Sequence, residues 1–315
     1  PMLYEELRRR GVPTRLLLGP WTHVEAAQAP DLPASVAPSL DALAVRWFDR
    51  HVRGRRDATM DDDLRPVTYH EIGSGRWRTA PRWMPRSVRA ETYQLDGSAA
   101  PGRPGILRSG APRREGSGDV YPVPVAGLCT RSASQWTAGL AAIPWCETDS
   151  RLNDQLGTAW ESAPLKRPVH LIGPVNARLF VSTTARDGML SVAVEDVAPD
   201  GTVDRLTGGW QVLSHRRLVA KRSLRRDGEV LQPWHPFTRK AQLAVEPGEV
   251  MRVDVEVFPT GAVLRKGHRL RVTVQAFDTP HLTPTAPQTV DGAGGVITVL
   301  HGPEHRSRLV LPVRD

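Results

Sequence analysis

The hydrophobic residues of this chain follow two different spacings. In residues 1–64 the spacing is helical, and it predicts a short helix that Gly11 ends and a longer one over residues 40–51 that Ser39 caps. Residues 15–18 between them, an arginine followed by three leucines, predict a strand. These elements form a helix–strand–loop–helix unit, which is typical of the last part of a doubly wound α/β domain.

From Arg65 onward apolar and polar residues alternate, which predicts antiparallel strands with one buried face. The alternation is clearest in four stretches: residues 177–181, 192–194, 251–257 and 270–276. No helix is predicted in this region, and residues 97–126, which are rich in Gly and Pro, are expected to form an exposed loop. The sequence therefore predicts an α/β segment followed by an all-β domain.

The composition of the chain limits the classes of partner that we expect it to bind. Hydrophobic residues make up 40% of the 315 residues, which is enough for a sizeable core. The formal net charge is +8, but the basic residues are scattered between acidic ones, without a compact basic run that carries interleaved aromatic residues. No apolar stretch approaches the ~18 residues of a membrane span. We therefore expect neither nucleic acid nor a membrane as a partner.

The residues that most often hold metals or form disulfides show no matching pattern. Cys129 and Cys146 are too few for a disulfide framework and are expected as free thiols, with a single bridge as the alternative. Three aspartates and two histidines have spacings that fit no metal site: Asp196, Asp200, Asp204, His215 and His235. His268, at the start of a strand, is expected to make a structural hydrogen bond. The sequence predicts no metal and no cofactor.

A histidine follows the first strand in the stretch Gly19-Pro20-Trp21-Thr22-His23. In α/β-hydrolases the loop after a buried strand holds the histidine that accepts the proton of a serine nucleophile, so His23 is the candidate catalytic base. Trp21 is a candidate for packing over the acyl or leaving group, with a place in the core as the alternative. The chain contains no G-x-S-x-G elbow for the serine.

Four stretches carry a family resemblance: residues 19–23, 48–54, 172–175 together with 194–201, and 266–272. Through them the chain resembles the CocE/NonD group of serine hydrolases, which contains cocaine esterase, α-amino-acid ester hydrolase and glutaryl acylase. This group shares its C-terminal domain type with Xaa-Pro dipeptidyl-peptidases. The resemblance implies that residues 1–64 are the C-terminal segment of an α/β-hydrolase domain. It also implies that residues 65–315 are an all-β jelly roll, a galactose-binding-like β-sandwich.

The resemblance also implies a mechanism, in which a Ser-His-Asp triad cleaves a bond through an acyl-enzyme. His23 matches the triad base, whereas the serine and the aspartate are expected upstream of Pro1. The chain is therefore interpreted as the C-terminal part of a larger serine hydrolase, inactive by itself. The alternatives are a non-catalytic jelly-roll binding module and an inactive truncated fragment.

The partners expected from this interpretation are a small ester, amide or peptide substrate and the missing N-terminal α/β-hydrolase portion. Homo-oligomer formation is left open. The expected location is cytoplasmic, with secretion left open.

Overall fold

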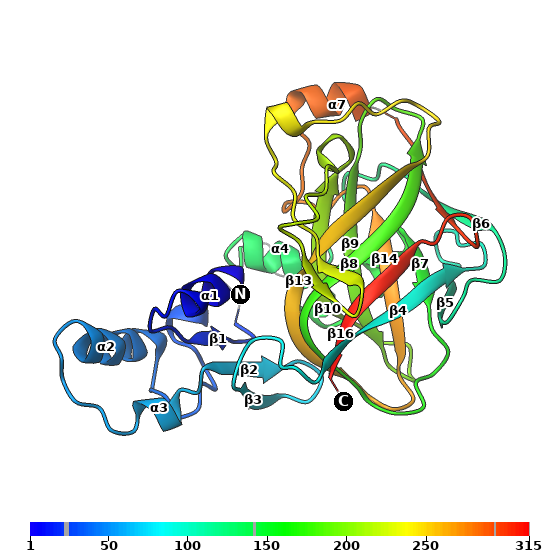
Figure 1. Ribbon diagram of the computed structural model, residues 1–315. Coiled ribbons are helices and arrows are strands. Elements are labelled where there is room, and N and C mark those ends of the chain that lie inside the picture. Colours follow the sequence, from blue (N-terminus) through cyan, green and yellow to red (C-terminus); the bar gives the residue numbers. More distant parts are fainter. Residues whose placement is uncertain (22–24, 141–142, 293, 315) are drawn as a thin grey trace.

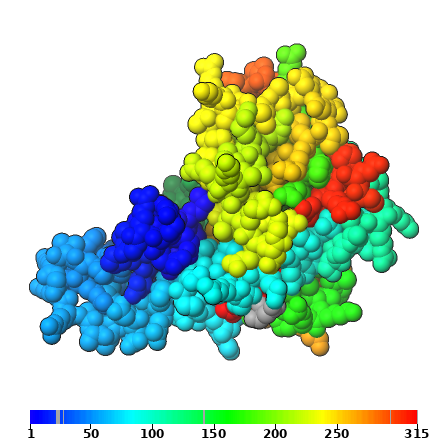
Figure 2. Space-filling view, in the orientation of Figure 1, coloured from blue at the N-terminus to red at the C-terminus, as the bar shows by residue number. Residues whose placement is uncertain are grey.

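The computed structural model describes residues 1–21, 25–140, 143–292 and 294–314, and most of its regular structure is β. It consists of an N-terminal unit (residues 1–80) beside a β domain (residues 88–314), with α4 (Arg131–Trp136) between them (Figure 1). Figure 2 shows the N-terminal unit, in blue, as a lobe that projects from one side of the β domain. No helix in the described part of the chain is both long and apolar enough to cross a membrane.

The N-terminal unit contains the helices and the strand predicted there. Its elements are α1 (Met2–Arg9), β1 (Leu16–Leu18), the 3-10 helix η1 (Glu25–Ala27), α2 (Leu40–His51), α3 (Met60–Asp63), β2 (Val67–Glu71) and β3 (Arg76–Ala80). The predicted cap is confirmed, because the Ser39 hydroxyl accepts a hydrogen bond from the N–H of Ala42 at 3.1 Å. β1 pairs in parallel with β2, so the boundary expected after residue 64 falls inside one three-stranded sheet.

The β domain is built around a sheet that closes on itself. Nine strands follow one another in the order β13-β10-β9-β14-β7-β5-β4-β16-β8, and β13 also pairs with β8, which completes a barrel-like ring. β15 and β6 extend the sheet from β8. The strands are β4 (Val88–Asp96), β5 (Gly105–Ser109), β6 (Gly116–Val120), β7 (Thr158–Glu161), β8 (Val169–Thr183), β9 (Met189–Val197), β10 (Val203–Val212), β13 (Met251–Leu264), β14 (Arg269–Gln275), β15 (Ile297–His301) and β16 (Arg308–Arg314).

Aliphatic side chains from many strands form one core inside this sheet. Leu179, Val192, Val255 and Leu309, from four different strands, all belong to it and are almost completely buried. Burial of this apolar area, at about 25 cal/mol per Å², is the main stabilising contribution that the sheet provides. The strands predicted from alternation at residues 251–257 and 270–276 are confirmed: the first lies within β13, and β14 contains the second up to Gln275.

The prediction of no helix in the β region is wrong. The described residues of this region form four short helices: α4, α5 (Pro144–Thr148), α6 (Arg151–Asp154) and α7 (Ala286–Gly292). They also form the short hairpin of β11 (Leu224–Arg226) and β12 (Glu229–Gln232) and the 3-10 helices η2 (Leu213–His215) and η3 (Arg239–Ala241). None of these four helices exceeds seven residues, which is too short to produce a clear helical period in the sequence.

The expected loop over residues 97–126 is also corrected, because it contains β5 and β6. The alternation of apolar and polar residues does not reveal these strands, because glycines replace apolar side chains where the strands pack. A Cβ atom at Gly118 would lie 2.9 Å from the ring of Trp160, which is fully buried. Glycine therefore lets β6 approach the large indole closely, and the usual alternation disappears.

The expectation of half-buried strands fails for β9, in which all nine residues are buried. Its inner face contributes to the core, and its outer face is covered by polar groups rather than by water. On that outer face Glu195 accepts a hydrogen bond from the Thr273 hydroxyl at 2.8 Å, and burial raises the pKa of Glu195 well above its ordinary value.

Cys129 and Cys146 form a disulfide, which corrects the expectation of two free thiols. Cys129 directly precedes the N-cap of α4, and Cys146 lies within α5. These two helices pack against each other, which brings the two Cα atoms to 4.8 Å, a separation that a disulfide spans. The spacing along the sequence contains no information about this approach.

Candidate functional site

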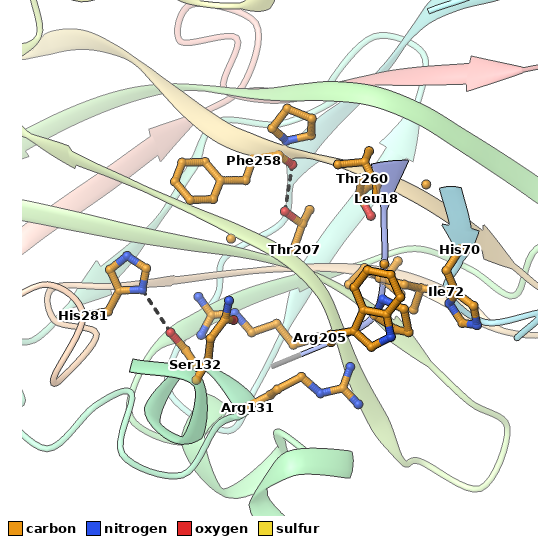
Figure 3. Close-up of a pocket in the computed structure, with 18 of the residues that line it drawn as sticks. Leu18, His70, Ile72, Arg131, Ser132, Arg205, Thr207, Phe258, Thr260 and His281 are labelled. Atoms are coloured by element: carbon orange, nitrogen blue, oxygen red, sulfur yellow. Dashed lines mark hydrogen bonds between the residues drawn. The ribbon is translucent and has the colours of Figure 1, made fainter. Parts of the chain in front are cut away.

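A cavity of about 330 Å³, called here the junction cavity, lies where the N-terminal unit meets the β domain. One wall consists of residues 18–21, at the end of β1, and His70 of β2. The other wall consists of α4, parts of β10 and β13 around Thr207 and Thr260, and His281 (Figure 3). Its size lies in the range of about 300–1,000 Å³ that small-molecule sites occupy.

The two walls are fixed relative to each other by contacts between the end of β2 and β13. The N–H of Ile72 donates to the carbonyl of Gly261 at 2.9 Å, and the N–H of Val263 donates to the carbonyl of Ile72 at 2.8 Å. The ring of Tyr69 packs directly on Gly261, where a Cβ atom would overlap it. The cavity is therefore formed by a bonded junction rather than by a loose contact between two lobes.

Trp21 lines this cavity and also packs against a small hydrophobic core of the N-terminal unit. Its indole N–H donates to the carbonyl of Pro30 at 2.7 Å, and its ring lies 5.7 Å from the ring of Trp77. The half-buried indole is thus held in place and contributes one face to the cavity. His23, two residues further along the sequence, lies outside the described residues, so its role and that of Trp21 in binding substrate stay predictions.

Aromatic rings line the opposite wall. The imidazole of His281 lies between two indoles, with ring centroids 4.1 Å from Trp136 and 3.5 Å from Trp210. Phe258 of β13 extends this series, 5.0 Å from Trp210 in an edge-to-face arrangement. Figure 3 shows His281 directed toward Ser132 on α4, and Ser132 Oγ lies 3.1 Å from His281 Nδ1.

The contact between Ser132 and His281 has the atoms of a nucleophile and its base, but its surroundings oppose that chemistry. The pKa of His281 is lowered to about 4, chiefly by burial; the nearby charge of Asp278 opposes this shift and that of Arg205 adds to it. The imidazole is therefore neutral near pH 7, and its Nδ1 shares a hydrogen bond with the Ser132 hydroxyl. A general base must become an imidazolium during the reaction, which this environment disfavours. The contact positions the two side chains.

A buried ion pair supports the same wall. Arg205, on β10, donates to the carboxylate of Asp278 at 2.8 Å, and Asp278 is completely buried. The same carboxylate oxygen accepts from the Trp210 indole at 2.9 Å and from the Ser191 hydroxyl at 3.4 Å. The pair and these hydrogen bonds compensate for the burial of both charged groups.

Other residues that the sequence analysis considered as candidates for a metal site or a structural hydrogen bond make structural contacts. His268 Nδ1 lies 2.9 Å from both carboxylate oxygens of Asp196, which confirms the predicted structural hydrogen bond. Asp200 accepts from the N–H of Thr202 within a turn, and the ring nitrogens of His235 face two backbone carbonyl oxygens. Within the described ranges, no group of three or more His, Cys, Asp or Glu side chains is arranged to hold a metal ion.

The sequence did not indicate the residues that shape the far wall. Ser132 and His281 are 149 positions apart, and Arg131 and Arg205 lie in segments without a recognisable motif. They come together only because β10, β14 and α4 converge at the junction. No local signal could have identified them.

Comparisons with known proteins agree with the resemblance. The family model described as the X-Pro dipeptidyl-peptidase C-terminal non-catalytic domain matches residues 59–310. A serine esterase of Mycobacterium bovis is 29% identical over 307 residues, which cover 95% of this chain and 45% of the relative. The cocaine esterase of a Rhodococcus strain is 26% identical, over 95% of this chain and 51% of that enzyme.

The fold recurs in a solved structure of an α-amino-acid ester hydrolase, with a TM-score of 0.69 and 18% sequence identity. The match covers 99% of this chain and 52% of that one. At this identity the likeness concerns the fold alone. The chain spans about half the length of the curated relatives it matches.

Proposed function

The chain belongs to the family of X-Pro dipeptidyl-peptidase C-terminal non-catalytic domains, and we propose that it works as the C-terminal part of a serine hydrolase that cleaves an ester or amide bond. In this proposal residues 1–64 are the last segment of an α/β-hydrolase domain, and residues 65–315 are a jelly roll of galactose-binding-like topology. The names of its relatives, a serine esterase and a cocaine esterase, support a hydrolase.

The junction cavity is the observation on which this proposal rests. The segment that ends in His23 lines it up to Trp21, and the β domain supplies the opposite wall. A non-catalytic domain that encloses a ligand-sized space together with residues 18–21, which lead along the sequence to the predicted base, has a direct role in a hydrolase, because it can bind and orient the substrate. The β domain then shapes the substrate site without supplying a triad residue.

The proposed reaction is acyl transfer to water. A serine outside this chain attacks the carbonyl carbon of the substrate, and His23 accepts the serine proton and returns it to the leaving group. Water then attacks the acyl-enzyme with His23 as the base again, which releases the acid and restores the serine. A chain without the serine elbow is inactive alone in this proposal.

Exposed apolar surface supports a further α/β portion that packs on the N-terminal unit. Val45 and Phe48 of α2 and Val52 at its C-cap are 60%, 59% and 75% exposed. β1 is an edge strand of its sheet in the described part of the chain, with β2 on its other side. An open parallel edge beside an exposed apolar helix face is the arrangement that additional parallel strands and helices would cover.

A binding module is the second candidate, because the cavity wall exposes aromatic rings. Trp136 is 58% exposed and Phe258 is 51% exposed, and exposed rings of this kind can stack on apolar faces of a carbohydrate. A module of this type binds its ligand without cleaving it. Turnover therefore separates the two candidates.

Hydrolysis by the full product of the gene that encodes this chain is the test. The substrates are 4-nitrophenyl butyrate, an ester, and Ala-Pro-4-nitroanilide, an amide that a dipeptidyl-peptidase would cleave. His23→Ala is expected to lower kcat by a factor of about 10⁴ or more, since removal of a triad base has effects of that size. His51→Ala, at the exposed end of α2, is the control and should retain activity. Hydrolysis that survives His23→Ala would refute the proposal, and sugar binding without any hydrolysis would favour the module.

A further inference from the structure

The charge that faces the junction cavity is positive. Its described lining contains two arginines, Arg131 and Arg205, and neither Asp nor Glu. Two histidines also line it, and burial lowers the pKa of both His70 and His281, so neither is charged near neutral pH. The charge of the wall therefore comes from the two guanidinium groups.

Among the residues that the structure describes, one of these two guanidinium groups has a partner and the other has none. Arg205 is neutralised by Asp278, whereas Arg131 makes no hydrogen bond or ion pair with any residue that the structure describes. The nearby carboxyl of Asp204 does not form an ion pair with Arg131. Burial raises the pKa of Asp204, and the charge of Arg131 lowers it by a smaller amount. Figure 3 shows Arg131 extending from α4 toward the side of the cavity where His70 lies.

A half-buried, unpaired guanidinium is an unusual feature, because removing such a charge from water is costly unless an anion pairs with it. The planar group presents parallel N–H donors that match a carboxylate, and such a pair is shorter and stronger than a neutral hydrogen bond. Ester or amide cleavage by itself requires no cation at this position. The arginine is therefore suited to recognise a charged part of the ligand.

The same cavity offers an apolar surface for the rest of the ligand. The rings of Trp136, Trp210 and Phe258 follow one another along the wall that includes α4. Trp21 provides a further indole from the N-terminal unit. A ligand that uses both features combines an anionic end with a flat or bulky apolar body.

We propose that the junction cavity binds a ligand in which a carboxylate is joined to an apolar body of about the size of a phenyl ring, and that Arg131 binds this carboxylate. That this ligand is the substrate rests on the proposed function. In that case the enzyme prefers esters or amides that carry a free carboxylate. Arg131 then selects among substrates, while bond cleavage is the task of the triad.

Binding of phenylacetate and phenylacetamide to the purified chain tests this inference without any turnover. The two probes have nearly the same shape, but only phenylacetate carries a carboxylate. By isothermal titration calorimetry, phenylacetate should bind at least about tenfold more tightly, and added salt should weaken its binding selectively. Arg131→Gln should abolish this preference, and Arg131→Lys should keep part of it, because the charge remains without the planar fork.

Arg113→Gln is the matched control, since it removes the same charge at an exposed position outside the cavity and should leave the preference unchanged. Equal binding of the two probes, no binding of either, or equal effects of Arg131→Gln and Arg113→Gln would overturn the inference. Thermal unfolding of each variant verifies that it is folded. Since no bond is cleaved, this result is independent of His23, and failure of the hydrolase proposal would be seen separately in the turnover assay.

Discussion

Replacing His281 by Gln is expected to make the stability of this protein less sensitive to acid between about pH 7 and about pH 5. The imidazole is enclosed by Trp136 and Trp210, and burial lowers its pKa from 6.5 to about 4. As the pH falls, the unfolded chain therefore binds a proton on this ring before the folded chain does. Stability from this group is complete above about pH 6.5 and is lost progressively as the pH falls toward 4.

The size of the effect follows from the two pKa values. With 6.5 for the unfolded chain and about 4 for the folded one, linkage gives a loss of about 2 kcal/mol between pH 7 and pH 5. Because His281 is partly exposed, solvent screening reduces the expected loss to about 1 kcal/mol. Gln keeps an oxygen that can accept the hydrogen bond of Ser132, but it does not titrate.

Urea unfolding at pH 7 and pH 5 measures this difference for both proteins. The wild type should lose about 1 kcal/mol more than His281→Gln on acidification, whereas a control variant, His51→Gln, should lose as much as the wild type. If wild type and His281→Gln lose the same amount, the ring does not experience the enclosed, apolar environment described here. The account of this cavity wall would then be wrong.

Three further changes test the packing that supports the cavity, each by urea unfolding. Joint replacement of Cys129 and Cys146 by Ala should cost about 3 kcal/mol, because the disulfide closes a loop with a sequence separation of 17 residues. Gly209→Ala should cost about 3 kcal/mol or more, since a Cβ atom there would overlap the backbone of β13. Asp278→Ala should cost about 3–5 kcal/mol, because it leaves the buried charge of Arg205 without a partner.

Each of these predictions has an outcome that contradicts it. A disulfide variant as stable as the wild type would show that α4 and α5 are held together without the bridge. A mild effect of Gly209→Ala would show that β10 and β13 can separate slightly at low cost. Unchanged stability of Asp278→Ala would mean that Arg205 finds another partner, and the described wall would then be incomplete.

The parts of the fold that the sequence predicts are those with a local cause. The helix over residues 40–51 has an apolar stripe and a serine cap, and both are local features. The strands β13 and β14 alternate because one face of each lies in the core. Where both faces are covered, as in β9, or where glycine packs against Trp160, the same rule gives the wrong burial or no strand.

The residues of the candidate site also differ in whether a local sequence feature could predict them. Trp21 belongs to a motif on a single segment, so the sequence alone could single it out, and it lines the junction cavity. Arg131, Ser132 and His281 depend on the convergence of segments far apart in the sequence, so no spacing could reveal them. The pairing of Cys129 with Cys146 depends likewise on helix packing.

If this chain completes a serine hydrolase in which His23 is the base, the DNA immediately upstream of the codon for Pro1 encodes the rest of the triad, and sequencing that DNA is the decisive experiment. The account predicts an open reading frame continuous with this chain. That frame should encode a G-x-S-x-G elbow followed by an aspartate, in the order Ser, Asp, His. A stop codon or an unrelated sequence at this position would contradict the account and leave a β domain that binds ligands without cleaving them.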